Sequence, residues 1–160
     1  KFTVVIDNIE DFEKYPAQYI SEAGQSINVK FFTITLLSRS PEMVNLSISN
    51  TAYPQEHIRG MHFSCNLHYI GSAMSFSFRL NNGTANRISF WIRNDNGMID
   101  EDPRMVVSFL NSSGQLLRTI TVTAQYNSLE QQVDSGMLGG IKTIRFIPYA
   151  GFYLDYFKVE

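Results

Sequence analysis

The chain has 160 residues, 44% of them hydrophobic and 18% charged, which fits one globular domain rather than two. Its 13 basic and 15 acidic residues give a net charge of −2, which excludes the strongly basic surface of a protein that binds duplex nucleic acid. The single cysteine excludes an internal disulfide, and no apolar run reaches the ~18 residues that a membrane span needs. Because the chain opens without an initiator Met or a signal peptide, we expect residues 1–160 to be a single domain excised from a larger protein.

A two-residue alternation of apolar and polar side chains predicts strands along most of the chain. It is strict from Met74 to Leu80, and over residues 88–93 it puts Ile88, Phe90 and Ile92 on one face. In chain order, the predicted strands are residues 2–6, 28–37, 43–49, 58–65, 74–80, 88–93, 104–110, 119–124, 141–147 and 152–159. Residues 10–24 form the least regular stretch.

Turn sequences separate these strands at spacings expected of antiparallel hairpins. They are Asn81-Asn82-Gly83, Asp95-Asn96-Gly97, Ser112-Ser113-Gly114 and Gly139-Gly140. No helical pattern of 10 to 15 residues alternates with the strands, which disfavours a parallel α/β sheet. About ten strands in one domain predict an all-β fold, a two-sheet antiparallel β-sandwich of jelly-roll type.

The two ends of the chain carry short motifs. Asp11-Phe12-Glu13 lies near the start, and the closing strand places Asp155 within an otherwise mostly apolar run from Phe152 to Val159. Together, these two terminal motifs resemble those of the galactose-binding-like jelly roll, in particular carbohydrate-binding modules of the family 11, 4 and 22 type. The resemblance implies a ligand that lies across a concave sheet and a structural calcium ion near the joined chain ends.

Trp91 is the main candidate for ligand binding because the alternation sets it opposite the apolar face, beside Ser89 and Arg93. Sugar C–H faces stack on aromatic rings, while sugar hydroxyls bond to polar groups. Tyr126 and Tyr149 are candidate second platforms, and Arg93, Asn94 and Gln125 are candidate hydrogen-bonding residues. The structural alternative is that Trp91 packs under a loop or the N-terminal segment.

Three carboxylates are the candidate metal ligands that the resemblance implies. Asp11, Glu13 and Asp155 would bind calcium, which prefers oxygen ligands. The alternative is that Asp11 and Glu13 are solvated and that Asp155 caps backbone amides. His62, Cys65 and His68 are spaced as in some zinc sites, but on a strand the cysteine faces away from the histidines, so we expect a buried thiol and two surface or groove histidines.

No motif of a serine hydrolase, zinc protease or phosphate-binding loop occurs in the sequence, so we do not expect an enzyme. A small glycoside hydrolase stays open, because the separation of two carboxylates is invisible in sequence. The sequence therefore predicts a non-catalytic carbohydrate-binding module for a neutral poly- or oligosaccharide, secreted or at the cell surface. We expect it to be monomeric, attached to other domains, without a nucleic-acid partner or a membrane span.

The alternative is a protein-interaction or receptor-binding domain of a larger cell-surface protein, adhesin or toxin. Exposed apolar side chains grouped around Phe31, Met61 and Met137 would favour it, because a contiguous apolar patch usually marks an interface.

Overall fold

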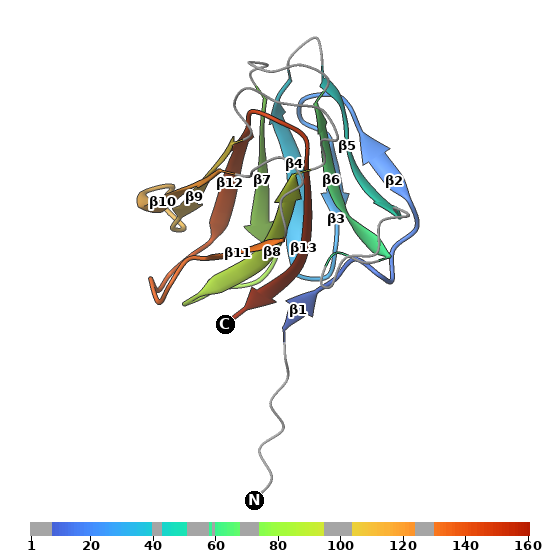
Figure 1. The fold of residues 1–160 in the computed structure, drawn as a ribbon. Coiled ribbons are helices and arrows are strands. Elements are labelled where there is room, and N and C mark those ends of the chain that lie inside the picture. Colours follow the sequence, from blue (N-terminus) through green and yellow to red (C-terminus); the bar gives the residue numbers. More distant parts are fainter. Residues whose placement is uncertain are drawn as a thin grey trace, which may run out of the picture.

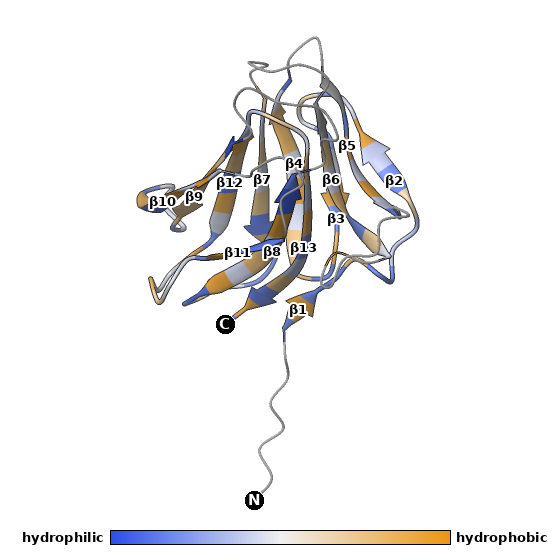
Figure 2. Cartoon of the chain, in the orientation of Figure 1, coloured by the Kyte–Doolittle hydropathy of each residue, from blue (hydrophilic) through white to orange (hydrophobic). Residues whose placement is uncertain are grey.

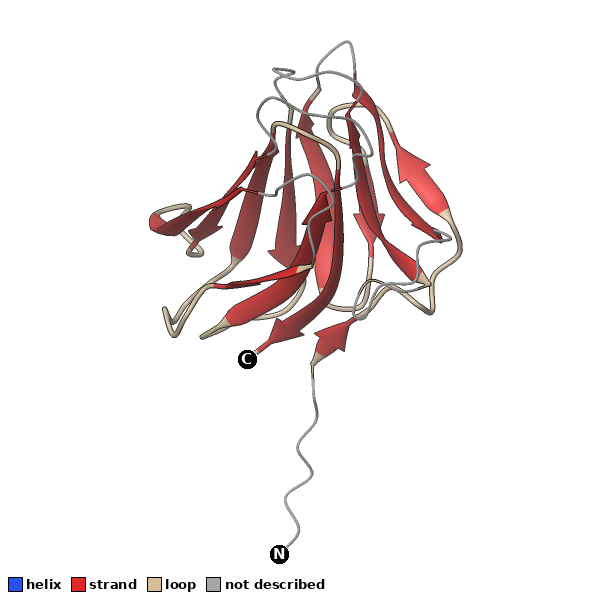
Figure 3. Cartoon of the chain, viewed as in Figure 1, coloured by secondary structure: helices blue, strands red, loops and turns tan. Residues whose placement is uncertain are grey.

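A computed structural model describes residues 8–39, 43–50, 58, 60–67, 74–94, 104–123 and 130–160. These residues form strands, turns and loops and contain no helix, as Figure 3 shows. Two antiparallel sheets pack face to face, so the predicted two-sheet β-sandwich is confirmed (Figure 1).

The first sheet has seven strands. Its strands are β1 (Ile9–Glu10), β2 (Gln18–Ile20), β5 (Met43–Asn50), β6 (Met61–Leu67), β8 (Ile88–Asn94), β11 (Gln131–Asp134) and β13 (Phe152–Val159). Their spatial order is β11-β8-β13-β6-β5-β2, and β1 pairs with the second half of β13. β13 is therefore central, with β8 along one edge and β6 followed by β1 along the other.

The second sheet has six strands. Its strands are β3 (Ser26–Asn28), β4 (Phe32–Ser38), β7 (Ser75–Leu80), β9 (Arg104–Leu110), β10 (Leu116–Thr123) and β12 (Thr143–Pro148), in the order β10-β9-β12-β7-β4-β3. Hydrophobic and hydrophilic residues alternate along many strands of both sheets, as Figure 2 shows. That alternation gives each sheet one apolar face, and the two apolar faces meet.

Phenylalanine dominates the core between the sheets. Phe157 of β13 stacks on Phe78 of the opposite sheet and on Phe90 of β8, with both ring-centre distances at 4.7 Å. The largest fully buried side chains are Phe12, Phe32, Phe63, Phe76, Phe78, Phe90, Phe109, Phe146, Phe152, Phe157, Ile34 and Leu36. Because each aromatic side chain buries a large apolar area, this cluster is the main source of hydrophobic stabilisation.

Several predicted elements need correction. The single strand predicted over residues 28–37 is a hairpin, in which residues 29–31 connect β3 to β4. Residues 10–24, the stretch without regular alternation, contain β2 and the end of β1, and β11 was not predicted at all. The strand predicted over residues 2–6 lies outside the described residues.

Of the predicted hairpin turns, Ser112-Ser113-Gly114 does join two paired strands, β9 and β10. Asn81-Asn82-Gly83 and Gly139-Gly140 instead join strands of different sheets, β7 to β8 and β11 to β12. A tight turn sequence is equally compatible with a crossing between sheets, because it constrains the backbone locally and not the pairing partner. Asp95-Asn96-Gly97 lies outside the described residues.

Candidate functional site

The outer face of the seven-stranded sheet, defined as the face turned away from the six-stranded sheet, carries Trp91. Ile88, Phe90 and Ile92 of β8 are buried in the core, which leaves Ser89, Trp91 and Arg93 on the outer face as predicted. The Trp91 side chain is partly exposed.

Strand register defines what surrounds Trp91. Gln132 of β11 lies directly opposite it on one side, and Asp155 of β13 lies opposite on the other. Residues directly opposite in an antiparallel pair share a face, with Cβ atoms about 4.5–5.5 Å apart. Gln132 is exposed, so its amide adds a hydrogen-bonding group beside the Trp91 ring. Gln132 is not predicted from the sequence, because β11 is too short for its alternation to stand out.

Arg93 lies opposite Tyr153 of β13, and Tyr153 lies opposite Ser64 of β6. Asn94, at the end of β8, is partly exposed and lies opposite Phe152. Because Phe152 is buried in the core, this register puts Asn94 on the inner face, so the structure groups Trp91 with Arg93 but not with Asn94. Gln125 and Tyr126, which are also predicted for this site, lie outside the described residues.

Tyr149 follows β12 and belongs to the connection that leads to β13. Its ring lies against Arg104, whose guanidinium carbon is 4.2 Å from the ring centre. Its N–H donates to the Arg104 carbonyl oxygen at 2.9 Å. One ring face is thus occupied by a cation–π contact, so only the opposite face is available to a sugar.

Part of the outer face is closed. The Ile58 N–H donates to a carboxylate oxygen of Glu130 at 3.0 Å, although residue 58 precedes β6 and residue 130 precedes β11. Since β13 and β8 separate β6 from β11 in the sheet, this bond joins segments that precede two strands that are not neighbours. His62 and Asp155, both on the outer face, are 0% and 2% exposed. A ligand therefore meets the β8 and β11 side of this face.

His62 is buried, so the prediction of a surface or groove histidine at this position is wrong. Its Nδ1 lies 3.1 Å from the Gly60 carbonyl oxygen, and its ring contacts Tyr153 edge-on at 4.7 Å. Cys65 points into the core on the other side of β6, as the alternation predicts. His68 lies outside the described residues.

Asp155 is the most perturbed acid in the structure. Burial, helped by the negative charges of the nearby acids Glu13, Asp11 and Glu130, raises the pKa of Asp155 from 3.8 to about 9, against a hydrogen bond from the Tyr156 N–H that lowers it. That bond is 2.8 Å long. Asp155 therefore accepts a backbone N–H, as the structural alternative predicts. Asp11, Glu13 and Glu130 lie near enough to Asp155 to affect its pKa, and we call these four residues the acidic neighbourhood.

The backbone around these acids is unusual. Phe12 and Tyr156 have φ values of 61° and 58°, in the left-handed region that side chains other than glycine rarely adopt. The register of β13 against β8 shifts between Asp155 and Lys158. Such strain persists where the surroundings enforce it and often marks a functional site.

Glu13 sits against a tight turn before β6. Its carboxylate accepts the Met61 N–H at 3.1 Å. Gly60 has a φ of 62°, and a Cβ there would lie 2.6 Å from a Glu13 carboxylate oxygen, so only glycine allows this approach.

Asp11, Glu13 and Asp155 would offer a metal ion carboxylate oxygens with a net negative charge, which suits calcium. Across the described ranges, however, no group of three or more His, Cys, Asp or Glu side chains is placed to hold a metal ion. Backbone or amide oxygens would have to complete a calcium shell built on Asp155 and Glu13.

No helix in the described part of the chain is long and apolar enough to cross a membrane.

No protein-family model and no curated protein matches the chain. Among solved structures, it is similar to the K2 cleaved adhesin domain of Lys-gingipain, with a TM-score of 0.54, 13% identity and coverage of 96% of this chain and 97% of that one. The K1 adhesin domain of Lys-gingipain from Porphyromonas gingivalis W83 gives a TM-score of 0.53 at 14% identity and covers 98% of both chains.

The chain is also similar to part of an arabinose-bound GH51 α-L-arabinofuranosidase, with a TM-score of 0.58 and 8% identity. The match covers 95% of this chain but 26% of the arabinofuranosidase, so the chain spans about a quarter of that enzyme. At these identities the similarities establish the fold: the chain shares its two-sheet sandwich with adhesin domains and with one part of a glycosidase.

Proposed function

We propose that the chain is a non-catalytic carbohydrate-binding module that holds a neutral glycan on the outer face of the seven-stranded sheet. The observation that carries this proposal is the partly exposed Trp91 ring, flanked in the sheet by Gln132 and followed on the same face of β8 by Arg93. An aromatic plane bordered by planar polar groups suits a pyranose, which presents C–H faces and hydroxyls together.

In this proposal each residue has a defined role. Trp91 stacks on a sugar ring, while Arg93 and Gln132 hydrogen-bond hydroxyls. Tyr149 offers its second ring face, and Gln125 and Tyr126 remain predicted contributors. Because His62 and Asp155 are buried on this face, the glycan runs along β8 and β11 rather than across the whole sheet.

The fold shared with adhesin domains is consistent with a binding role, and with a secreted or cell-surface location in a larger protein. The closer resemblance to family 11, 4 and 22 modules stays a prediction. A protein-interaction role has less support, because Phe31 and Met61 pack against the core and only Met137 of the three predicted patch residues is largely exposed, at 73%.

We also propose that Asp155 and Glu13, with Asp11 nearby, hold a structural calcium ion. The support is a buried carboxyl with a raised pKa, surrounded by further acids and by strained backbone. A divalent cation would offset the repulsion between these carboxylates, and so would stabilise the junction of β1, β6 and β13.

A glycan-array screen of the chain and of Trp91→Ala tests the binding role. We expect reproducible binding of neutral glycans by the chain and its loss in Trp91→Ala, with the melting temperature close to that of the unchanged protein because Trp91 lies outside the core. Tyr19→Ala, which removes an aromatic side chain 71% exposed on β2, is the matched control and should bind as the unchanged chain does. Equal binding by the Trp91 variant would overturn the proposed site.

A further inference from the structure

A pocket lies between the residue that precedes β1 and the end of β13. Figure 1 shows β1 and the end of β13 at the same end of the sandwich. Its volume is about 290 Å³, at the lower limit of the roughly 300–1,000 Å³ typical of small-molecule sites, and so suits one sugar unit. Four separate segments line it, through Asn8, Lys30, Phe31, Leu80, Asn82, Thr84, Val159 and Glu160.

Hydrogen bonds fix the Lys30 side of this pocket. The Lys30 N–H donates to the Tyr15 hydroxyl at 2.5 Å and to a Glu10 carboxylate oxygen at 3.2 Å. The Asn81 amide donates to the carbonyl oxygens of Val29 and Lys30 at 3.0 and 3.3 Å, so the turn between β3 and β4 is attached to the end of β7.

The other walls are equally well held. The Lys142 ammonium donates to the Gly83 carbonyl oxygen at 3.0 Å, which fixes the turn that carries Asn82 and Thr84. The Val159 N–H donates to the Asn8 carbonyl oxygen at 2.9 Å. A pocket whose walls are already ordered loses little conformational entropy when a ligand binds.

The two charged side chains that line the pocket, Lys30 and Glu160, differ in whether they are paired within the protein. Glu160 lies 3.8 Å from Arg87 and 3.7 Å from Lys158, so its negative charge is offset within the protein. Lys30 has no carboxylate partner among the residues that the structure describes, and its ammonium lies 5.1 Å from the centre of the Phe31 ring. The pocket thus offers one uncommitted cation, with the Asn82 amide and the Thr84 hydroxyl exposed beside it.

We propose that this pocket binds a single sugar unit that carries a carboxylate, such as a uronic acid residue, independently of Trp91. Lys30 pairs with the carboxylate, Asn82 and Thr84 hydrogen-bond ring hydroxyls, and Leu80 and Val159 contact the C–H surface. This site goes beyond the neutral-glycan site on the sheet face, and neither depends on the other.

The test is a titration of the 160-residue chain, labelled with ¹⁵N, by methyl β-D-glucuronide, and in parallel by its neutral analogue methyl β-D-glucoside. We expect the glucuronide to shift the backbone amides of Phe31, Asn82 and Val159, and to bind at least about threefold more tightly than the glucoside at low salt. The difference should shrink as ionic strength rises.

Lys30→Gln should remove the preference for the glucuronide, because it deletes the charge and leaves the backbone contacts of residue 30 in place. Lys14→Gln, at an exposed lysine that does not line the pocket, should keep it. Trp91→Ala should also keep it, so failure of the sheet-face site and failure of the pocket are separate results. Equal affinity for the two glycosides, or no shift at the three pocket amides, would overturn the proposal.

Discussion

Gly60 shows how one residue sets the geometry of the acidic neighbourhood. Its left-handed backbone and missing side chain let the Glu13 carboxylate come within hydrogen-bonding reach of the turn before β6. That contact places Glu13 where its charge raises the pKa of Asp155. A single glycine therefore determines both a turn and the electrostatics of a buried acid.

Gly60→Ala should destabilise the protein by about 2 kcal/mol, combining the left-handed strain with loss of the Glu13 hydrogen bond. Gly83→Ala is a close control, because φ is 61° there and a Cβ would meet nothing within 4 Å. It should cost about 1 kcal/mol, for strain alone. Urea unfolding of both variants measures the difference, and equal losses would mean that the approach of Glu13 adds no stability.

Asp155 gives the fold an unusual pH dependence. Its folded pKa of about 9 lies above the unfolded value of 3.8, so the folded state holds a proton that the unfolded state releases. The stability it contributes is complete below about pH 4 and is lost as pH rises toward 9, by at most about 1.4 kcal/mol per pH unit. In chelator, Asp155→Asn should flatten this decline and unfold at higher urea than the unchanged chain at pH 8. Parallel pH profiles would contradict the raised pKa.

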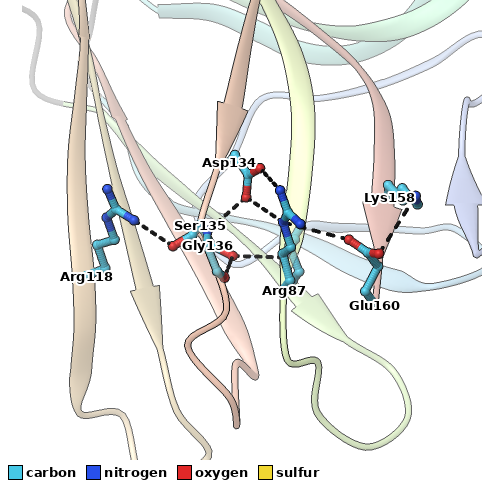
Figure 4. A network of polar contacts seen from close by, with 8 residues as sticks. Arg87, Arg118, Asp134, Ser135, Gly136, Lys158 and Glu160 are labelled. Carbon is cyan, nitrogen blue, oxygen red and sulfur yellow. Dashed lines mark hydrogen bonds and ion pairs between the residues drawn. The ribbon is translucent and has the colours of Figure 1, made fainter.

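At the scale of elements, a polar network holds the edge strands together, as Figure 4 shows. Arg87, just before β8, donates to both carboxylate oxygens of Asp134 at the end of β11. Arg118 of β10 donates to the Ser135 carbonyl oxygen at 2.9 Å. Because β10 and β11 are the edge strands of different sheets, this network joins the two sheets along one side of the sandwich.

Asp134→Asn should weaken this connection. The Arg87 hydrogen bonds hold the pKa of Asp134 below its usual value, so the stability from Asp134 is present above about pH 4 and is lost as pH falls through the lower folded pKa. Since the pair is partly exposed, we expect a loss of about 0.5–1 kcal/mol at pH 7 and a smaller loss at pH 2. Glu22→Gln, which breaks the exposed Arg39 pair, should cost less. Denaturant melts at both pH values would show a loss independent of pH if this account is wrong.

The elements also show what sequence patterns can predict. Strands of six or seven residues such as β7, β8 and β9 were predicted nearly to the residue, because alternate side chains along most of each strand face the core. β2, β3 and β11 have four residues or fewer, too short for a period of two to stand out, and pairing with a neighbouring strand defines them.

For the candidate site too, the sequence predicts what one strand determines and misses what depends on distant segments. Alternation put Trp91 and Arg93 on the outer face, because that depends on one strand alone. Gln132 beside Trp91, and the burial of His62 and Asp155 on the same face, depend on contacts between distant segments that no local pattern encodes.

At the scale of the whole molecule, the acidic neighbourhood joins the first strand, the middle of the chain and the last strand. If calcium binds there, it stabilises the folded state alone, so the melting temperature at pH 8 should rise with calcium concentration and fall in chelator. Asp155→Asn should lose this response, and Glu22→Gln should keep it. A melting temperature that is the same in calcium and in chelator would argue against the ion.

The pairing of β1 with β13 has a consequence for how the protein is made. Residues 9–10 bind residues 157–158, and the neighbours of β13 on its other edge come from the middle of the chain. During synthesis the nascent chain therefore exposes the apolar faces of β6 and β8 until their central partner leaves the ribosome. Long-range strand pairings form slowly, so the risk of aggregation through β6 and β8 lasts until β13 pairs with both strands.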